Sequence, residues 1–386
     1  MWRFVPPTST LEGFAPALFL MFSAGRVNCA VLNILNIPPL LFGPRQVNTQ
    51  DIMRTALISV TAFALFLLML EMCFRLVVYL EKGSHEDRYL VLPDAALGWS
   101  LNTRMRPKRF RNKCGEAVNL APAPHRLILK SPGNTDKKKI LFLGDSYTHA
   151  HEVSTGKAYY DVFEQLEMEN YAVYVVAVGG YGNLQEYLAL EAVFSLIQPD
   201  IAVWQLTEND VGNNVYELDE DSLRRNQRPR PYLEPQSGKI SIRNPGIWLF
   251  DWSEGFAYLF IKLLILDSKH NLGIIAWLNS FFAMDADSRN NFEKQGLAVL
   301  NQVVSRAVNS YSETTFVGFS VDPRYDRQYQ AIFNNNGALY LASFFKELET
   351  GGKTDCRPLD THWNHVGNQV AGVALSKRIR EALIDD

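Results

Sequence analysis

An apolar run that ends abruptly in a Gly-Asp-Ser turn constrains the fold more than any other part of the chain. After Lys139, residues 140–143 are apolar, and Gly144-Asp145-Ser146 follows them directly. A buried strand of a parallel sheet has this composition, and sites in such sheets form beyond the carboxyl ends of the strands. The segment therefore predicts an α/β domain that presents the hydroxyl of Ser146 at the edge of a sheet.

Strand-like and helix-like segments alternate through this region, which predicts a parallel sheet with helices on both faces. The expected strands are Lys139–Leu143, Ala172–Val178, Ile201–Leu206 and Thr314–Phe319, and the expected helices are Ala158–Glu169, Gln185–Leu196, Asn291–Tyr311 and Val366–Ile384. Ser146, Gly182 and Asn209 each follow an expected strand within a few residues. They should therefore converge on one edge of the sheet.

A serine hydroxyl is a poor nucleophile at neutral pH unless a base, an orienting carboxylate and donors for a developing oxyanion lie beside it. The segment Asp360-Thr-His362-Trp-Asn364 supplies a carboxylate and an imidazole two residues apart. Their side chains would lie on one side of an extended segment. The imidazole could then take the serine proton while the carboxylate fixes its tautomer.

Four short blocks resemble the SGNH (GDSL-type) hydrolase family, and they occur in the family's order. They are Gly144-Asp145-Ser146-Tyr147, Gly179-Gly180-Tyr181-Gly182, Glu208-Asn209-Asp210 and Asp360-Thr361-His362-Trp363-Asn364. The resemblance implies a three-layer α/β/α flavodoxin-like fold. It also implies that Ser146 is the nucleophile, His362 the base and Asp360 its orienting acid. The oxyanion hole would consist of the N–H groups of Ser146 and Gly182 and the side chain of Asn209.

The blocks depart from the common family pattern at a few positions. One residue separates Asp360 from His362, and this shortened Asp-x-His-Trp-Asn block is familiar in membrane-anchored and polysaccharide-modifying branches. Thr207 replaces a frequent glycine, Glu208 adds a carboxylate to the asparagine block, and Ala177 stands where many members have asparagine. These changes bear on substrate and rate more than on fold.

Composition sets the frame for these motifs. A chain of 386 residues with 47% hydrophobic and 20% charged residues has room for one catalytic domain and an appendage. The net charge of -3 means that basic residues are not in excess, so nucleic acid is not an expected partner. Glu208 and Asp210 lack a His or Cys cluster at ligand spacing, so no metal or other cofactor is expected.

A long apolar run near the N-terminus predicts a membrane anchor. Thr55–Leu70 carries no charge, and after Glu71 and Arg75 the apolar character resumes to Leu80. About 20 apolar residues cross a bilayer as a helix, and this run over residues 55–80 suffices if Glu71 and Arg75 pair near one end. We expect an uncleaved single-pass anchor over residues 53–82. A cleaved signal peptide and a buried helix are the alternatives.

Charged residues around the run bear on its orientation. Arg26, Arg45 and Arg54 precede it and favour a cytoplasmic N-terminus, whereas Lys82 and Arg88 weigh the other way. The hydrolase domain is therefore expected outside the cytoplasm, in a periplasm or at the cell surface.

The segments on either side of the anchor are less regular. Residues 1–52 hold short apolar patches broken by prolines, and Met53-Arg54 followed by the apolar run has the layout of a signal anchor. We therefore consider that translation starts at Met53; the alternative is a loosely ordered or membrane-surface extension. Residues 83–136 are expected to be a juxtamembrane linker, with a basic stretch from Arg104 to Lys113, and residues 137–386 the hydrolase domain.

Between about residues 211 and 290 the simple alternation stops. Short apolar segments at 247–250, 256–266 and 272–282 are too short to span a membrane. They predict either a helical cap over the site or a surface that rests on a bilayer or an acyl chain. A core-packing insertion is an equal alternative.

Three further histidines are candidates for a role in the site. His149 and His151 follow Ser146 closely, but histidines there are typical of polar surface. His365 competes with His362 for the role of base, and the His-x-Asn pattern favours His362.

Asp145 is expected to support its turn through backbone hydrogen bonds rather than to take part in chemistry. Cys114 and Cys356 could form a disulfide if the domain is extracytoplasmic. Two unpaired thiols are the alternative.

The expected function is that of a serine esterase, which hydrolyses an O-acyl ester, such as an O-acetyl ester, through an acyl-enzyme on Ser146. Its partner would be an acylated small molecule or polysaccharide. An O-acyltransferase acting on a cell-envelope polysaccharide and a non-catalytic scaffold of the same fold are the alternatives. Retention of Ser146, Asn209, Asp360 and His362 speaks against the scaffold, and Glu208 speaks for it.

Overall fold

The computed structural model describes residues 49–83, 89–132, 136–220, 228–234, 237–244, 273, 284–341 and 345–384. The chain divides into two units, Met1–Phe66 and Leu67–Asp386. Residues 1–48, including most of the uncertain leader, lie outside the described part, and the start at Met53 stays a hypothesis.

A single long helix, α2 (Thr49–Gly83, 35 residues), carries the apolar run. Its stretch Met53–Leu76 is long and apolar enough to cross a membrane. Nε of Arg75 lies 2.8 Å from Oε1 of Glu71, so the two charges at the end of the run pair as their spacing predicts. Membrane anchors and signal sequences share these properties, and the helix by itself does not distinguish them.

Five parallel strands form the main sheet, in the order β11-β10-β7-β5-β6. They are β5 (Lys138–Gly144), β6 (Tyr171–Ala177), β7 (Ile201–Leu206), β10 (Thr315–Ser320) and β11 (Leu339–Tyr340). Counted along the chain, this is the doubly wound order 5-4-3-1-2 of flavodoxin-like folds. The predicted α/β class and its four strands are confirmed, and the short strand β11 is an addition.

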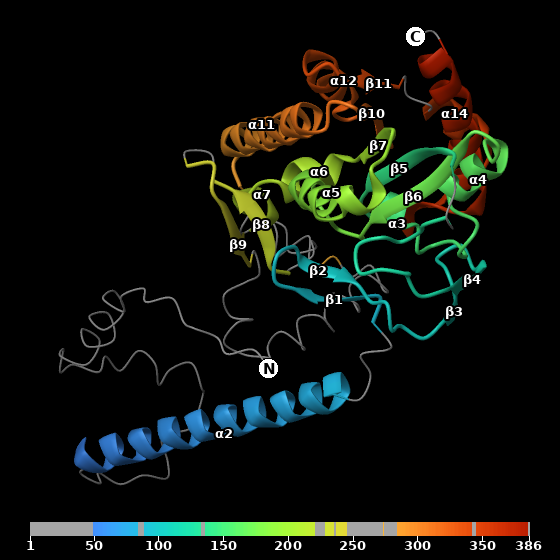
Figure 1. The fold of residues 1–386 in the computed structure, drawn as a ribbon. Coiled ribbons are helices and arrows are strands. Elements are labelled where there is room, and N and C mark those ends of the chain that lie inside the picture. Colours follow the sequence, from blue (N-terminus) through green and yellow to red (C-terminus); the bar gives the residue numbers. More distant parts are fainter. Residues whose placement is uncertain are drawn as a thin grey trace. The chain divides into compact units, whose positions relative to one another are not determined.

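Alternate residues of β5 face two separate hydrophobic clusters, and this makes the domain three layers thick. Ile140 and Phe142 pack with residues of α4 (Tyr159–Leu166) and α14 (His365–Ile384). Leu141 and Leu143 pack on the opposite face, which is covered by α5 (Asn183–Ile197), α11 (Ala286–Ser310) and α12 (Asp326–Asn335) (Figure 1). Because both faces are covered, the strand is apolar along its whole buried length.

The segment expected to be a linker is packed structure. It forms two antiparallel hairpins, β1 (Val91–Asp94) with β2 (Gly98–Leu101) and β3 (Lys108–Arg111) with β4 (Ala117–Leu120). Leu97, Trp99 and Leu127 are buried in the same cluster as Leu141 of the sheet. Residues 89–132 are therefore part of the domain rather than a free tether.

The expected insertion is described only in part. It contains α6 (Glu208–Asn213), α7 (Tyr216–Glu220) and the antiparallel pair β8 (Arg230–Leu233) and β9 (Ile240–Arg243). The apolar segments at 247–250, 256–266 and 274–282 lie outside the described residues, so the cap stays a prediction.

Cys114 and Cys356 form a disulfide, with their Cα atoms 5.1 Å apart. Of the two alternatives left open by the sequence, the structure has the bonded one. The bond joins the turn between β3 and β4 to β12 (Asp355–Cys356), which pairs antiparallel with β13 (Asp360–Trp363). It therefore connects the N-terminal hairpins to the strand that carries Asp360 and His362.

We predict that Gly296→Ala destabilises the domain, although alanine is favoured over glycine in a helix by about 1 kcal/mol. A Cβ on Gly296 of α11 would lie 2.2 Å from the carbonyl oxygen of Val211 in α6. Overpacking of this kind costs about 1–3 kcal/mol and outweighs the helical gain. Chemical denaturation should show a lower free energy of unfolding. Gln302→Ala, at an exposed position of the same helix, is the control and should change it little. A stabilised Gly296→Ala variant would contradict the close packing of α11 on α6.

Candidate active site

Ser146 lies where β5 leaves the sheet. Asp145 caps the short helix α3 (Ser146–His149), and its Oδ1 accepts a hydrogen bond from the N–H of Tyr147 at 3.1 Å. Asp145 is fully buried. The carboxylate therefore supports the turn through the backbone at the carboxyl end of a central strand, and its Oδ2 also accepts from Oγ of Ser146 at 3.1 Å.

Three side chains from distant parts of the chain form one hydrogen-bonded chain. Oγ of Ser146 lies 2.8 Å from Nε2 of His362, and Nδ1 of His362 lies 2.6 Å from Oδ1 of Asp360. The N–H of His362 also donates to Oδ1 of Asp360 at 3.0 Å. Both side chains project from β13, so the two-residue spacing places them on one side of an extended strand.

The pKa of His362 is the sum of opposing influences. Burial lowers it, but the hydrogen bond to Asp360 and the negative charges of Glu152, Asp360 and Asp145 outweigh burial and raise it to about 9. Conversely, burial raises the pKa of Asp360, and its hydrogen bonds from His362 more than compensate and hold it below its ordinary value. The carboxylates therefore favour the imidazolium, and the neutral imidazole, which is the form that can accept a proton, becomes more populated as the pH rises toward the pKa of His362.

His365, the competing base, lies elsewhere. Its side chain is 65% exposed, and Nδ1 contacts Oε1 of Glu116 at 2.5 Å. It begins α14 rather than facing the serine. Among the residues that the structure describes, His362 is the histidine in contact with Ser146.

Asn209 lies at the start of α6 with its amide held at both ends. Thr207 donates from Oγ1 to Oδ1 of Asn209, and Nδ2 of Asn209 donates to Oδ2 of Asp145 at 3.2 Å. Thr207 also caps the helix by accepting the N–H of Asn209 at 3.2 Å. The threonine that replaces the common glycine therefore orients the amide, and leaves its second N–H for a ligand.

The N–H of Gly182, the expected glycine donor, already has a partner within the protein. Gly182 is buried, and its N–H donates to Oε1 of Gln185 at 3.2 Å within the cap of α5. A Cβ there would lie 2.8 Å from Cβ of Asn213, so Gly182 is a packing glycine. Gly180 instead lines the same cavity as Ser146 and Asn209. Its φ of 83° is one that glycine adopts without strain.

His149, read from the sequence as polar surface, supports the glycine turn. The N–H of Gly179 donates to its Nδ1 at 3.0 Å, and burial, aided by the charge of His151, lowers its pKa to about 3. The imidazole therefore stays neutral and remains an acceptor. From the other side, Nε1 of Trp99 donates to the carbonyl oxygen of Gly179 at 3.2 Å. No local pattern could have revealed contacts made across 30 and 80 residues.

Glu152 is a second carboxylate at the base that sequence reasoning missed. Its Oε1 lies 3.6 Å from Nδ1 of His362, and the residue is 7% exposed. Ligand atoms of Glu152, Asp360 and His362 lie within 4.8 Å of one another, a grouping that could also hold a metal ion. Because Nδ1 of His362 is already hydrogen-bonded to Asp360, the grouping is accounted for by the protein's own contacts.

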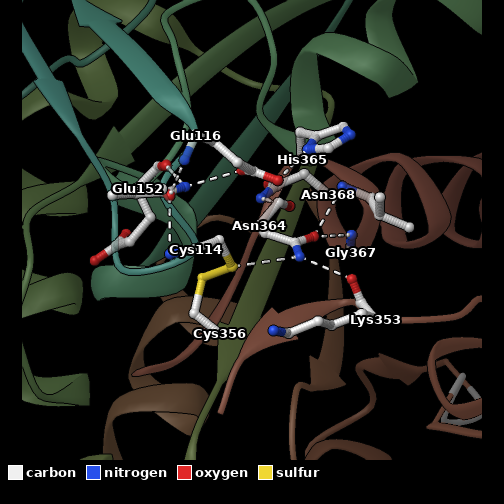
Figure 2. A network of polar contacts seen from close by, with 12 residues as sticks. Cys114, Glu116, Glu152, Lys353, Cys356, Asn364, His365, Gly367 and Asn368 are labelled. Atoms are coloured by element: carbon white, nitrogen blue, oxygen red, sulfur yellow. Dashed lines mark hydrogen bonds and ion pairs between the residues drawn. A yellow bond between two sulfur atoms is a disulfide. The ribbon is translucent and has the colours of Figure 1, made fainter. Parts of the chain in front are cut away.

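The disulfide region holds the strand of the base in place (Figure 2). Nδ2 of Asn364 donates to the carbonyl oxygen of Lys353 at 2.7 Å and lies 3.7 Å from Sγ of Cys114. Oδ1 of Asn364 accepts from the N–H of Gly367 at 3.1 Å. The asparagine of the last block therefore joins β13, the start of α14 and the disulfide.

An open cavity of about 1170 Å³ adjoins these groups. It is lined by Ser146, Gly180, Asn209 and His362, and by residues of the disulfide region such as Lys353 and Thr354. On one wall, Nη1 of Arg324 lies 3.5 Å from Oε2 of Glu208, so the carboxylate of Glu208 is paired with this guanidinium. The arrangement can bind a carbonyl group beside a serine, a histidine and hydrogen-bond donors.

Comparisons with known proteins were made at the level of sequence and of structure. No family model and no curated protein match the chain. Among solved structures, it is similar to the psychrotrophic esterase EstA from Pseudoalteromonas sp. (10% identity, 64% of this chain, 100% of that chain, TM-score 0.38). It is also similar to a lipase/acylhydrolase from Enterococcus faecalis (12% identity, 64% and 96% coverage, TM-score 0.36). A third is an acetyl-xylooligosaccharide esterase from Geobacillus (13% identity, 64% and 96% coverage, TM-score 0.33). We base no residue's role on these similarities.

We predict that the imidazole of His362 titrates near pH 9, well above the ordinary histidine value of 6.5. The carboxylates favour the imidazolium, so the proton is kept to higher pH. NMR of 13C-labelled histidine should show this midpoint, assigned by its absence in His362→Gln. Asp360→Asn should lower it, since it removes the hydrogen-bonded carboxylate. A midpoint at or below 6.5 in the unmodified protein would contradict the described contacts.

Proposed function

We propose that this chain is a serine esterase of the SGNH type. The single observation that carries the proposal is the hydrogen-bonded chain from Ser146 through His362 to Asp360 at the carboxyl end of β5. A buried serine used only for structure needs no base behind it. A serine whose hydroxyl contacts an imidazole that is itself oriented by a carboxylate has the arrangement of an activated nucleophile.

In the proposed reaction, Oγ of Ser146 attacks the ester carbonyl carbon while its proton moves to Nε2 of His362. The resulting imidazolium is stabilised by Asp360. Collapse of the tetrahedral intermediate breaks the bond to the alkoxy oxygen, which takes the proton from His362 and leaves as an alcohol. Water then attacks the acyl-serine with His362 again as base, and the acid is released as Ser146 regains its proton.

The oxyanion of the tetrahedral intermediate needs donors aimed at one point. We assign this role to the N–H groups of Ser146 and Gly180 and to the second amide N–H of Asn209. Two sets of contacts support this assignment. Thr207 and Asp145 orient the amide of Asn209, and His149 holds the glycine turn. Gly182, with its N–H engaged inside the cap of α5, is left out of the hole.

The acceptor of the acyl group separates two versions of the proposal. Water as acceptor makes an esterase, and a hydroxyl of a cell-envelope polysaccharide would make an O-acyltransferase with the same acyl-serine. Hydrolysis of an O-acyl ester, such as an O-acetyl ester of a small molecule or a polysaccharide, is the version we adopt. It requires no second binding site.

We further propose that α2 is a single-pass anchor and that the hydrolase domain lies outside the cytoplasm. The stretch Met53–Leu76 has the length and composition of a span. The disulfide Cys114–Cys356 supports the placement, because such bonds persist in oxidising compartments and are rare in the cytosol.

We predict that the full chain in detergent reacts covalently with a fluorophosphonate and hydrolyses p-nitrophenyl acetate. Ser146→Ala should abolish both, because the attacking oxygen is removed. Asn209→Ala should keep the labelling site but lower kcat by roughly 10²- to 10³-fold, the usual effect of losing one oxyanion donor. Gel fluorescence measures the labelling and absorbance measures turnover.

Ser310→Ala, at an exposed position at the end of α11, is the matched control and should label as the unmodified protein does. Folded protein that neither labels nor hydrolyses the ester would leave the non-catalytic scaffold in place of the enzyme. Adding acylated and unacylated glycans to the same assay separates hydrolysis from acyl transfer.

We predict that protein taken from membranes with its thiols trapped carries the Cys114–Cys356 disulfide. Alkaline extraction should leave the chain in the membrane fraction. A maleimide-polyethylene glycol should modify two more cysteines after reduction than before it, and Cys114→Ser/Cys356→Ser should abolish that difference. Equal modification with and without reduction would place the domain in a reducing compartment.

A further inference from the structure

Two carboxylates, rather than one, face Nδ1 of His362. Oδ1 of Asp360 lies 2.6 Å from this nitrogen and Oε1 of Glu152 lies 3.6 Å from it. Asp360 reaches it from the same strand, β13, and Glu152 reaches it from the loop after α3. Nδ1 therefore has one hydrogen-bonded carboxylate, Asp360, and a second carboxylate, Glu152, at ion-pair distance.

Contacts of its side chain and of its backbone hold Glu152 in this position. Its side chain is 8% exposed, and Oε1 also lies 2.9 Å from Nε2 of His151. Its carbonyl oxygen accepts from Nδ2 of Asn112 at 3.0 Å. A buried carboxylate is costly unless it is paired, and the imidazoles of His151 and His362 are the partners that lie near Oε1.

The disulfide connects the backbone near Glu152 with the backbone of Asp360. Asn112, which contacts Glu152, organises the turn of Cys114: Oδ1 of Asn112 accepts from the N–H groups of Cys114 at 3.0 Å and of Glu116 at 2.9 Å. Cys114 is bonded to Cys356, which pairs with Asp360 between β12 and β13. One cross-link therefore sets the backbone beside Glu152 and the backbone of Asp360 relative to each other.

We propose that Glu152 is a positioning residue for His362, a second carboxylate that with Asp360 holds Nδ1 protonated and turns Nε2 toward Ser146. This inference rests on the proposed function. Glu152 touches no reacting atom and acts through the imidazole. It orients the ring and stabilises the imidazolium that forms when Ser146 loses its proton.

Every charged or titratable group that faces His362 enters the expected pH dependence. Asp360 lies on its own strand, Asp145 and Tyr147 lie at the start of α3, and His151 and Glu152 follow α3. Burial lowers the pKa of His362, and Asp360, Glu152 and Asp145 together raise it. Since only the neutral imidazole accepts the proton of Ser146, kcat/KM should rise with pH through this pKa.

The test measures kcat/KM for p-nitrophenyl acetate against pH in the full chain. Glu152→Gln keeps the shape and removes the charge, so the rising limb should move to lower pH by about one unit, the usual size of an effect of one close charge. The plateau should fall, because a less basic imidazole accepts the proton less readily. Glu116→Gln is the matched control, since Glu116 contacts Asn112 and His365 but not His362, and it should leave the limb in place.

A double-mutant cycle with Asp360→Asn sharpens the test. In Asp360→Asn, the carboxylate of Glu152 still lies at ion-pair distance from Nδ1, so part of the activity should persist. In Asp360→Asn/Glu152→Gln no carboxylate faces Nδ1, and the loss should exceed the product of the two single losses by about tenfold or more. Contacting residues that share one partner show such coupling.

The role of Glu152 would be overturned by two results together: a rising limb of kcat/KM that stays at the same pH in Glu152→Gln, and losses of activity in the double-mutant cycle that are merely additive in free energy. Failure of the proposed function is a separate outcome, recognised by unlabelled wild-type protein. In that event the NMR titration of His362 still decides: Glu152→Gln should lower its midpoint, and an unmoved midpoint overturns the inference.

Discussion

The hydrogen bonding of β5 on both of its edges is the constraint from which the site follows. Because β6 and β7 pair with it on either side and both faces are covered, its end is held by hydrogen bonds along both edges and by packing on both faces. Asp145 caps the helix that begins there, so the position of Ser146 is fixed as well. The base arrives from β13, a short strand outside this sheet, and depends on other means of support. A disulfide and the side chain of Asn364 supply them.

Those parts of the molecule that depend on period and order could be predicted from the sequence. Buried strands of a parallel sheet are continuous apolar runs, so four strands and the doubly wound class were predictable. The pair Asp360 and His362 was predictable because side chains two residues apart on a strand share a side. The five-residue run around Gly180 was harder: glycines at 179, 180 and 182 are equivalent in composition, and they differ in the partners of their N–H groups, His149 for Gly179 and Gln185 for Gly182.

Side chains that act through long-range contacts could not be predicted. His149 matters because the backbone of Gly179 meets it, and Glu152 matters because β13 brings His362 to it. Neither contact produces a periodic pattern in the sequence near these residues. The hairpins of residues 89–132 were read as a linker for a related reason: their apolar residues are interrupted by prolines and basic residues, and they are buried only once Trp99 and Leu127 meet the sheet. Local pattern predicts elements, whereas packing of elements decides these roles.

The carboxylate of Asp145 has a consequence for the end of the proposed reaction. Its Oδ2 accepts both from Oγ of Ser146 at 3.1 Å and from Nδ2 of Asn209 at 3.2 Å. An uncharged ester can approach these two donors, but the acid set free by hydrolysis becomes an anion beside a buried negative charge. Like charges repel each other, although less strongly where water reaches them, as it can in this open cavity. The residue that holds the serine in place would thereby help to expel the product and keep the site open for the next ester.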